Sequence, residues 1–264
     1  MKGLTAATRI LITIFVLTLA VLWSEPASSQ SFVAQYSRAK TQNFDQYNQK
    51  LKRGRFLEQL ADRLSAGVSL PEPVVITIAE CGSANAFYNP QHRTIVMCYE
   101  LIGHLVTGMQ RSFAKVASQQ EILDSVAGGI FFILMHELGH TLIHVLDLPV
   151  LGREEDAADQ IAAYLLLNTT GNSSSSGLAG ALWFFRSNTL FYTRRHFSSE
   201  HSLGPQRQSN LACWAFGKDP QRYQYLLVGK YLTRERAARC GGEYSRLDST
   251  VRKLLSNNLL LPLQ

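Results

Sequence analysis

Two histidines and one glutamate of this 264-residue chain lie within a five-residue segment. His136, Glu137 and His140 belong to the sequence HELGH, which has the pattern HExxH. If the segment is helical, residues four apart lie on one face, so both imidazole rings can bind one tetrahedral zinc ion. Glu137 would then lie beside a zinc-bound water and take its proton as the water attacks a carbonyl carbon. The pattern predicts His136 and His140 as ligands of one zinc per chain, and Glu137 as the general base.

The segments on both sides of HELGH are apolar. Phe131–Met135 precede it, and Leu142 and Ile143 follow it. This composition indicates a buried helix rather than a surface helix that carries two histidines by chance. Buried histidines and a buried glutamate need partners, and a metal ion supplies one.

A catalytic zinc site needs a third protein ligand and an open fourth position. His144 continues the four-residue spacing, but three such residues span about 12 Å of a straight helix, too far to share one ion. The longer pattern HExxHxxGxxH is broken, because Ile143 and Leu146 stand at its glycine and third-histidine positions. The third ligand is therefore expected in another segment.

The acidic segment that follows offers this ligand. Glu155 and Asp159 are four residues apart, on one face of a helix predicted from Arg153 to about Asn168. We expect Glu155 to bind the metal and Asp159 to accept a hydrogen bond from the second ring nitrogen of a ligand histidine, His136. Four small residues would let this helix approach HELGH closely: Ala157, Ala158, Ala162 and Ala163.

Two alternatives stay open for the acidic cluster. Glu154 or Asp156 could replace Glu155 as the ligand, because the sequence does not set the register of the first turn. The cluster by itself is also what an acidic cap at the positive end of an ordinary helix looks like.

HExxH followed by ExxxD resembles the gluzincin metallopeptidases, and the form ExxAD at Glu155–Asp159 resembles several of their families closely. Further segments resemble a bacterial family of exported proteins that is assigned to the metallopeptidases on the same motif. These segments are Cys81–Glu100, HELGH, Leu148–Asp159, and Gln206–Cys213 with Cys240. The resemblance covers most of residues 70 to 245, and it implies a zincin-like fold and hydrolysis of peptide bonds.

In zincins the sheet edge beside the active-site helix commonly binds the substrate backbone, and a Tyr, His or Arg polarises the carbonyl oxygen. Asn85–Tyr88 is the candidate edge, with an ordinary hairpin arm as the alternative. We predict His201 as the polarising catalytic residue, with a solvated loop histidine as the alternative. The other candidates for this role are Tyr192, His196 and Arg207.

The elements around the motifs indicate an α+β fold that is mostly helical. Apolar residues at helical spacing predict that Ser31–Ala66 forms one amphipathic helix or two. Strands are predicted at Val74–Ile78 and Thr94–Tyr99, with Asn85–Tyr88 as a third that pairs across a turn, so the sheet has about three strands.

A capping box at Ser118–Glu121 predicts a long helix to Asp147, with Gly128–Gly129 as a candidate kink or start. Asn172–Gly177, with four consecutive serines, is predicted as a loop. Residues 30–264 are predicted to form a single domain, with an N-terminal helical segment at 30–70 and a helical C-terminal part at 178–264.

Residues 1–29 have the composition of an export signal: basic Lys2 and Arg9, the apolar run Ile10–Trp23, and small residues at Ala27–Ser29. The run is shorter than the roughly 20 apolar residues of a membrane span. We therefore predict a secreted or periplasmic protein without stable membrane insertion after cleavage, with an uncleaved N-terminal anchor as the alternative.

Charge is mild and dispersed. The chain has 26 basic against 20 acidic residues, a net +6, and removal of residues 1–29 leaves 24 against 19, a net +5. Because no run of five basic residues occurs, the chain lacks the basic patch of a nucleic-acid-binding protein, and no nucleic-acid partner is expected.

The four cysteines are an even set, as expected for an exported protein whose thiols pair. Of the three possible connectivities we predict Cys81–Cys98 and Cys213–Cys240, because each closes a short loop. Each bridge would stabilise the fold by about 2–4 kcal/mol. Four free thiols are the alternative if the chain is not exported.

The sequence thus predicts an exported zinc metallopeptidase that acts on peptides or proteins, with an oligomeric state that the sequence does not indicate. The alternative is a catalytically silent zinc-binding or protein-interaction module on the same fold. The intact Glu137 argues against this alternative, because a structural zinc site has no need of a base.

Overall fold

The structure is a computed structural model that describes residues 30–169, 173–187, 193–229 and 231–260. Ser31–Gln264 forms one compact unit. The predicted export signal at residues 1–29 and the candidate residue Tyr192 lie outside the described residues.

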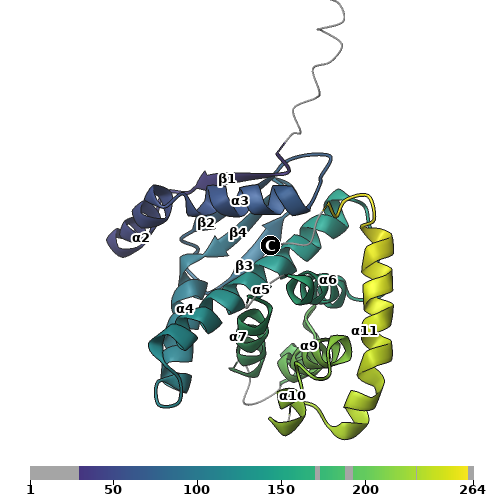
Figure 1. Ribbon diagram of the computed structural model, residues 1–264. Helices are drawn as coiled ribbons and strands as arrows, with labels where there is room; N and C mark the ends of the chain where they lie inside the picture. Colours follow the sequence, from purple (N-terminus) through teal and green to yellow (C-terminus); the bar gives the residue numbers. More distant parts are fainter. Residues whose placement is uncertain (1–29, 170–172, 188–192, 230, 261–264) are drawn as a thin grey trace, which may run out of the picture. The chain divides into compact units, whose positions relative to one another are not determined.

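A four-stranded mixed sheet forms one part of this unit (Figure 1). Its spatial order is β1 (Phe32–Tyr36), β2 (Val74–Ala79), β4 (Thr94–Cys98) and β3 (Ala86–Asn89). The first three strands are parallel, and β3 pairs antiparallel to β4 at the edge. The predicted α+β class is confirmed, and the sheet has four strands rather than about three.

The additional strand is β1, so the prediction of a wholly helical segment from Ser31 is wrong at its start. Phe32 pairs with Val74 and Tyr36 with Ile78, in parallel register. Phe32 is fully buried, and burial alternates along the strand as the pleat requires. Five residues are too few for their spacing to separate a strand from a helix, and the pairing partner lies far along the chain.

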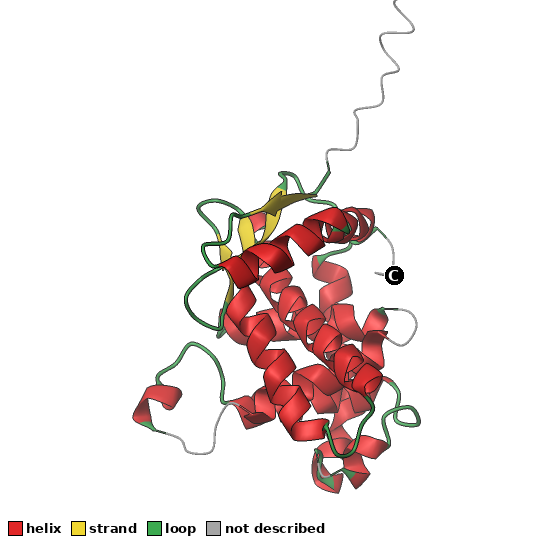
Figure 2. Ribbon diagram, turned by 90° about the vertical axis from the view of Figure 1, so that its left-hand side faces the viewer, coloured by secondary structure: helices red, strands yellow, loops and turns green. Residues whose placement is uncertain are grey.

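The sheet buries one of its faces more fully than the other. Ile76 and Ile95 pair across β2 and β4, and both are fully buried. On the opposite face Val33 is 39% exposed and Phe87 is 38% exposed. Helices cover the buried face, and in Figure 2 the strands lie together at one side of the helices.

Two helices follow β1, namely α2 (Gln42–Arg53) and α3 (Phe56–Gly67), and α3 packs against β1. The helix α4 (Tyr99–Phe113) begins directly after β4, so the strand predicted to Tyr99 ends one residue earlier.

The central helix α5 (Gln119–Val145) carries HELGH and contacts β3, β4, α4, α6 and α7. The predicted capping box is present, because Ser118 Oγ accepts from the Glu121 N–H while the Glu121 carboxylate accepts from the Ser118 N–H. Among the described helices α5 is long and apolar enough to cross a membrane, but 78% of its most apolar window is buried within the protein. Its apolar length is therefore that of a core helix.

The helix α7 (Ser173–Ser187) crosses α5 at close range. A Cβ atom at Gly128 would lie 2.3 Å from the Ser176 backbone, so this crossing requires a glycine. The helix α5 continues through Gly128 without a break. The predicted loop at Asn172–Gly177 is wrong from Ser173 onward, because packing against α5 outweighs the low helix propensity of serine.

The remaining named elements of the described chain are helices. The helix α6 (Glu154–Asn168) follows α5, as predicted. The later helices are α8 (Arg194–Phe197), α9 (Gly204–Lys218), α10 (Tyr225–Val228) and α11 (Arg234–Leu254).

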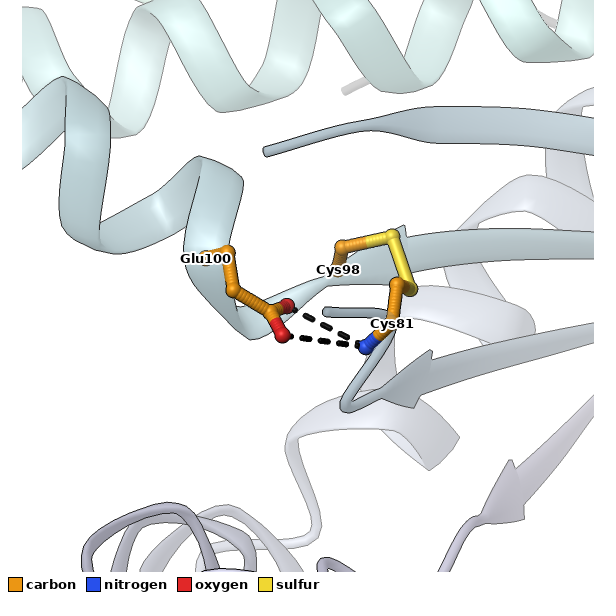
Figure 3. A group of neighbouring side chains, drawn as sticks. All are labelled: Cys81, Cys98 and Glu100. Atoms are coloured by element: carbon orange, nitrogen blue, oxygen red, sulfur yellow. Dashed lines mark hydrogen bonds between the residues drawn. A yellow bond between two sulfur atoms is a disulfide. The ribbon is translucent and has the colours of Figure 1, made fainter. Parts of the chain in front are cut away.

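Both predicted disulfides are confirmed. Cys213–Cys240 joins α9 to α11, and Cys81–Cys98 ties the segment after β2 to the end of β4. In Figure 3 the Glu100 carboxylate accepts hydrogen bonds from the Cys81 N–H at the same place. These three side chains are close together, but the two sulfur atoms are bonded to each other and so are not metal ligands. Two disulfides indicate that the protein folds in an oxidising compartment.

Candidate metal centre

The helices α5 and α6 approach each other closely at the motif itself. A Cβ atom at Gly139 would lie 2.8 Å from the Ala158 Cα, so a larger residue would separate the helices. Ala158 and Ala162 are fully buried, as expected from the alanines of the second motif. The two small-residue surfaces bring the polar side chains of the two motifs within contact distance.

Three side-chain atoms meet between these helices. His136 Nε2 lies 3.1 Å from Glu155 Oε2 and 3.2 Å from His140 Nε2. His140 Nε2 lies 3.5 Å from Glu155 Oε2. Atoms that bind one zinc ion at about 2.0–2.1 Å with tetrahedral angles are about 3.3–3.4 Å apart. We call this group the metal triangle, and its spacing fits zinc.

Carboxylates hold both imidazole rings from the opposite side. His136 Nδ1 is 2.9 Å from Asp159 Oδ1, and His140 Nδ1 is 2.7 Å from Glu154 Oε1. A ring that donates its Nδ1–H to a carboxylate directs the lone pair of Nε2 into the metal triangle. Two such lone pairs and the Glu155 oxygen repel one another unless a positive charge lies among them. The donor set therefore suits a divalent cation.

The pKa values show the same preference for positive charge. Burial by itself would lower the pKa of His136, but its hydrogen bonds to Asp159 and Glu155 raise the pKa to about 9. Burial would raise the pKa of Glu155, but hydrogen bonds from His136, His140 and His201 hold it far below its usual value. The site keeps its carboxylate ionised and stabilises a cation next to it.

Asp159 has a second partner in Arg207, which lies in the first turn of α9. Arg207 Nε donates to Asp159 Oδ2 and Nη2 donates to Oδ1, both at 2.7 Å. Burial would raise the pKa of Asp159, but hydrogen bonds from His136 and Arg207 keep it below its usual value. Arg207 thereby holds Asp159 ionised and in the orientation that binds His136.

Replacing Arg207 with methionine is expected to lower the free energy of unfolding by about 3–5 kcal/mol, because the buried Asp159 loses the guanidinium group that donates two hydrogen bonds to it. Urea unfolding of the chelator-treated protein, followed by circular dichroism, measures the change. The double variant Arg207→Met with Asp159→Asn should recover part of the loss, since it removes the buried carboxylate charge that Arg207 balanced. Equal stability of Arg207→Met and the wild type would show that the pair does not stabilise the fold.

Glu137 lies beside the metal triangle and is 6% exposed. Burial raises its pKa, against the positive charges of His136 and His140, and its carboxylate accepts a hydrogen bond from the Tyr88 backbone N–H. A carboxylate with a raised pKa can take up a proton and release it more readily near neutral pH.

Tyr88 can reach Glu137 because of the register of β3. The Cys98 N–H donates to the Asn85 carbonyl oxygen at 3.0 Å, and Phe87 pairs with Val96 in the same antiparallel ladder. Backbone groups of alternate residues face the neighbouring strand, so those of Ala86 and Tyr88 face away from β4. The predicted edge segment Asn85–Tyr88 therefore presents part of its backbone to the site.

A cavity of about 320 Å³ opens next to His136 and Glu137. Its walls come from the start of β3, the middle of α5, the end of α7 and the segment from His196 to Arg207. The site is therefore accessible from a hollow that is large enough for part of a ligand.

The remaining candidates have separate positions. His201 lines the cavity, and its Nε2 lies 2.8 Å from Glu155 Oε2. His196 also lines the cavity, and its Nδ1 accepts from the Thr193 N–H at 3.0 Å.

Three residues near the motifs have other partners. His144 Nδ1 is 3.0 Å from the Tyr88 hydroxyl oxygen. Asp156 accepts a hydrogen bond from the Ser202 hydroxyl, and Glu154 bonds to His140 as described above. Of the three acidic residues in the first turn of α6, Glu155 alone is a member of the metal triangle.

Several contacts of the site were not predicted, among them those of Tyr88 with Glu137, Glu154 with His140, Arg207 with Asp159, and His201 with Glu155. A backbone donor such as the Tyr88 N–H leaves no signal in the residue types. Pro205 near the start of a helix indicates that Arg207 lies in a first turn, but not that this turn faces Asp159.

An α+β fold in which two histidines of a buried HExxH helix meet a glutamate of the next helix defines a zincin-like metalloprotein. The comparison with protein families is consistent with this class. The chain belongs to the family described as "Putative metallopeptidase", whose model matches residues 36–255. No curated protein and no solved structure matches the chain.

Proposed function

We propose that the protein is an exported zinc peptidase of the gluzincin type, which hydrolyses peptide bonds. The observation that carries this proposal is the metal triangle of His136, His140 and Glu155, with Glu137 and a cavity beside it. The gluzincin assignment rests on a glutamate as the third ligand and on Asp159, which follows it by four residues and bonds to His136.

His136, His140 and Glu155 would hold the zinc ion, which when bound supplies a Lewis acid for a carbonyl group and for water. Asp159 keeps the proton of His136 on Nδ1 and so leaves Nε2 free for the metal. Glu137 takes a proton from the attacking water and delivers it to the leaving amine. The hydrogen bond from the Tyr88 N–H orients the Glu137 carboxylate for both transfers.

An extended peptide is the substrate that the sheet edge favours. The outward N–H and C=O of Ala86 can bond to a peptide backbone as an added strand does. Ala86 also lines the cavity, so a peptide bound along β3 passes next to Glu137.

We propose His201 as the residue that polarises the substrate carbonyl. It lies on the cavity wall beside Glu155, and its side chain is 47% exposed, so a ligand can reach it. Arg207 suits this role less well, because its side chain is only 12% exposed and two of its nitrogen atoms donate to Asp159.

We further propose that residues 1–29 direct the chain to the periplasm or the exterior, where a peptide or protein is its substrate. The oxidising compartment that the two disulfides indicate supports this location.

Removal of the metal is expected to abolish hydrolysis reversibly. Purified protein should contain one zinc per chain and cleave a fluorogenic peptide library, lose both on treatment with 1,10-phenanthroline, and regain both with added zinc. Metal analysis and fluorescence measure the two quantities together. A protein that holds zinc but cleaves nothing across the library would instead be a catalytically silent zinc-binding module.

A further inference from the structure

We infer that the turn between α2 and α3 is a docking surface for a membrane of anionic phospholipid. The residues that would touch the lipid lie at the end of α2 and the start of α3, and we call them the docking patch: Tyr47, Lys50, Lys52, Arg53, Arg55 and Phe56. None of them lines the cavity or belongs to the metal triangle, so the inference is independent of the proposed function.

Positive charge is concentrated at this turn, although it is dispersed along the chain as a whole. Residues 46–59 hold four basic residues and one acidic residue, a net +3, and all four basic residues are exposed. Of the ion pairs between described residues, none includes a cation of the docking patch. The one acidic residue, Glu58, accepts a hydrogen bond from the Tyr36 hydroxyl at 2.7 Å. The four cations are therefore available to an anionic surface.

Two exposed aromatic rings lie among these cations. Tyr47 is 56% exposed and Phe56 is 47% exposed, and Lys50 Nζ lies 5.9 Å from the centroid of the Tyr47 ring. Aromatic rings next to Lys and Arg are typical of surfaces that lie in the interface of a membrane, where the rings enter the headgroup region and the cations meet phosphate groups. The oxidising compartment that the two disulfides indicate is reached across a membrane, which favours lipid over nucleic acid as the partner.

The turn departs from the local rules of helix stability. Arg55 is the N-cap of α3 and has φ 51°, in the left-handed region that a residue with a Cβ atom rarely adopts. It also places a cation at the positive end of the α3 dipole, where Ser, Thr, Asp or Asn is preferred. Such departures are expected where a residue serves binding rather than stability.

The helix α2 contributes little to the core. Among its twelve residues only Asn48 is buried, and Asn48 Nδ2 donates to the Ser37 carbonyl oxygen at 2.7 Å. Phe44 and Leu51 are partly buried against the core. The main packing partner of α2 is α3, beside which it lies at the left of Figure 1. The end of α2 that carries the docking patch is thus left to solvent.

Binding to vesicles tests the inference. Residues 30–264 are used, because Ser31–Gln264 forms one compact unit and the apolar run Ile10–Trp23 would bind lipid by itself. The protein should sediment with vesicles of phosphatidylcholine and phosphatidylglycerol, mixed at about 7:3, in about 0.05 M salt. Its affinity should fall at least about 10-fold with pure phosphatidylcholine, and by a similar factor in about 0.5 M salt. Equal affinity for neutral and anionic vesicles, or no binding to either, would overturn the inference.

Removal of charge from the docking patch locates the effect. The triple variant Lys52→Gln, Arg53→Gln and Arg55→Gln should bind anionic vesicles about 100-fold more weakly than the wild type. A matched control removes three exposed basic residues of α11: Arg239→Gln, Arg246→Gln and Lys253→Gln. Each triple variant lowers the net charge of residues 30–264 from +5 to +2, so a difference between them reports the docking patch and not the net charge. Equal weakening in both would overturn the inference.

Removal of the two rings separates lipid from other anionic partners. The double variant Tyr47→Ser and Phe56→Ser should bind anionic vesicles about 10-fold more weakly and keep the salt dependence of the wild type, because the rings act by burial. Circular dichroism verifies that each variant is folded. Unchanged affinity in the folded double variant would overturn the inference. So would binding of a DNA duplex or single strand through the docking patch without binding to vesicles.

Discussion

The variant Glu137→Gln is expected to keep its zinc and to lose peptide hydrolysis by about 10²–10⁴-fold in kcat. Glutamine has the size of glutamate, and its amide oxygen can still accept the hydrogen bond from the Tyr88 N–H. It has no basic group near neutral pH, so it cannot take a proton from water. Because Glu137 is not a member of the metal triangle, the affinity for zinc should remain close to that of the wild type.

Hydrolysis of a fluorogenic peptide and the zinc content of the same sample are measured together. Glu235→Gln is the matched control, since Glu235 lies in the first turn of α11 and is exposed. It makes the same chemical change far from the site and should leave both quantities unaltered. Undiminished hydrolysis by Glu137→Gln would show that another group is the base.

His140→Ala is expected to lose zinc and, with it, hydrolysis. Structural zinc sites with four protein ligands bind with about 10–16 kcal/mol, so one ligand accounts for about 2.5–4 kcal/mol, or roughly 10²–10³-fold in affinity. The substitution also removes His140 Nδ1, the hydrogen-bond partner of Glu154, and one of the three histidine contacts of Glu155. The fold should persist, because His140 lies at the rim of the core with 15% of its side chain exposed.

The control for this variant is His92→Ala, at an exposed histidine in the turn between β3 and β4. Competition with a zinc-binding dye gives the affinity of each protein. Circular dichroism verifies that the two variants keep the helical content of the wild type.

Much of the site could be predicted from the sequence because it depends on local spacing. HExxH and ExxAD each place their polar residues four apart, and a helix turns that spacing into one face. The capping box at Ser118 predicted the start of α5, and the helix ends at Val145, two residues before the predicted end at Asp147. The alanines of α6 indicated a close helix pair. Cysteine spacing was sufficient for the two disulfides, since each closes a local loop.

The parts that were not predicted depend on contacts between distant segments. The strand β1 forms because Phe32–Tyr36 pairs with β2. The serine-rich start of α7 is helical because it packs closely against α5 at Gly128, which has no side chain. Arg207 reaches Asp159 only because α9 packs on α6. Residue types carry little information about such pairings, which tertiary packing decides.

The proposed hydrolysis depends on a metal ion held by His136, His140 and Glu155. The most direct test is the zinc content of the purified wild type and of His140→Ala, measured side by side by plasma mass spectrometry after dialysis against limiting zinc. We expect one zinc per chain in the wild type and a small fraction of that in the variant. Equal, stoichiometric zinc in both proteins would contradict the ligand assignment.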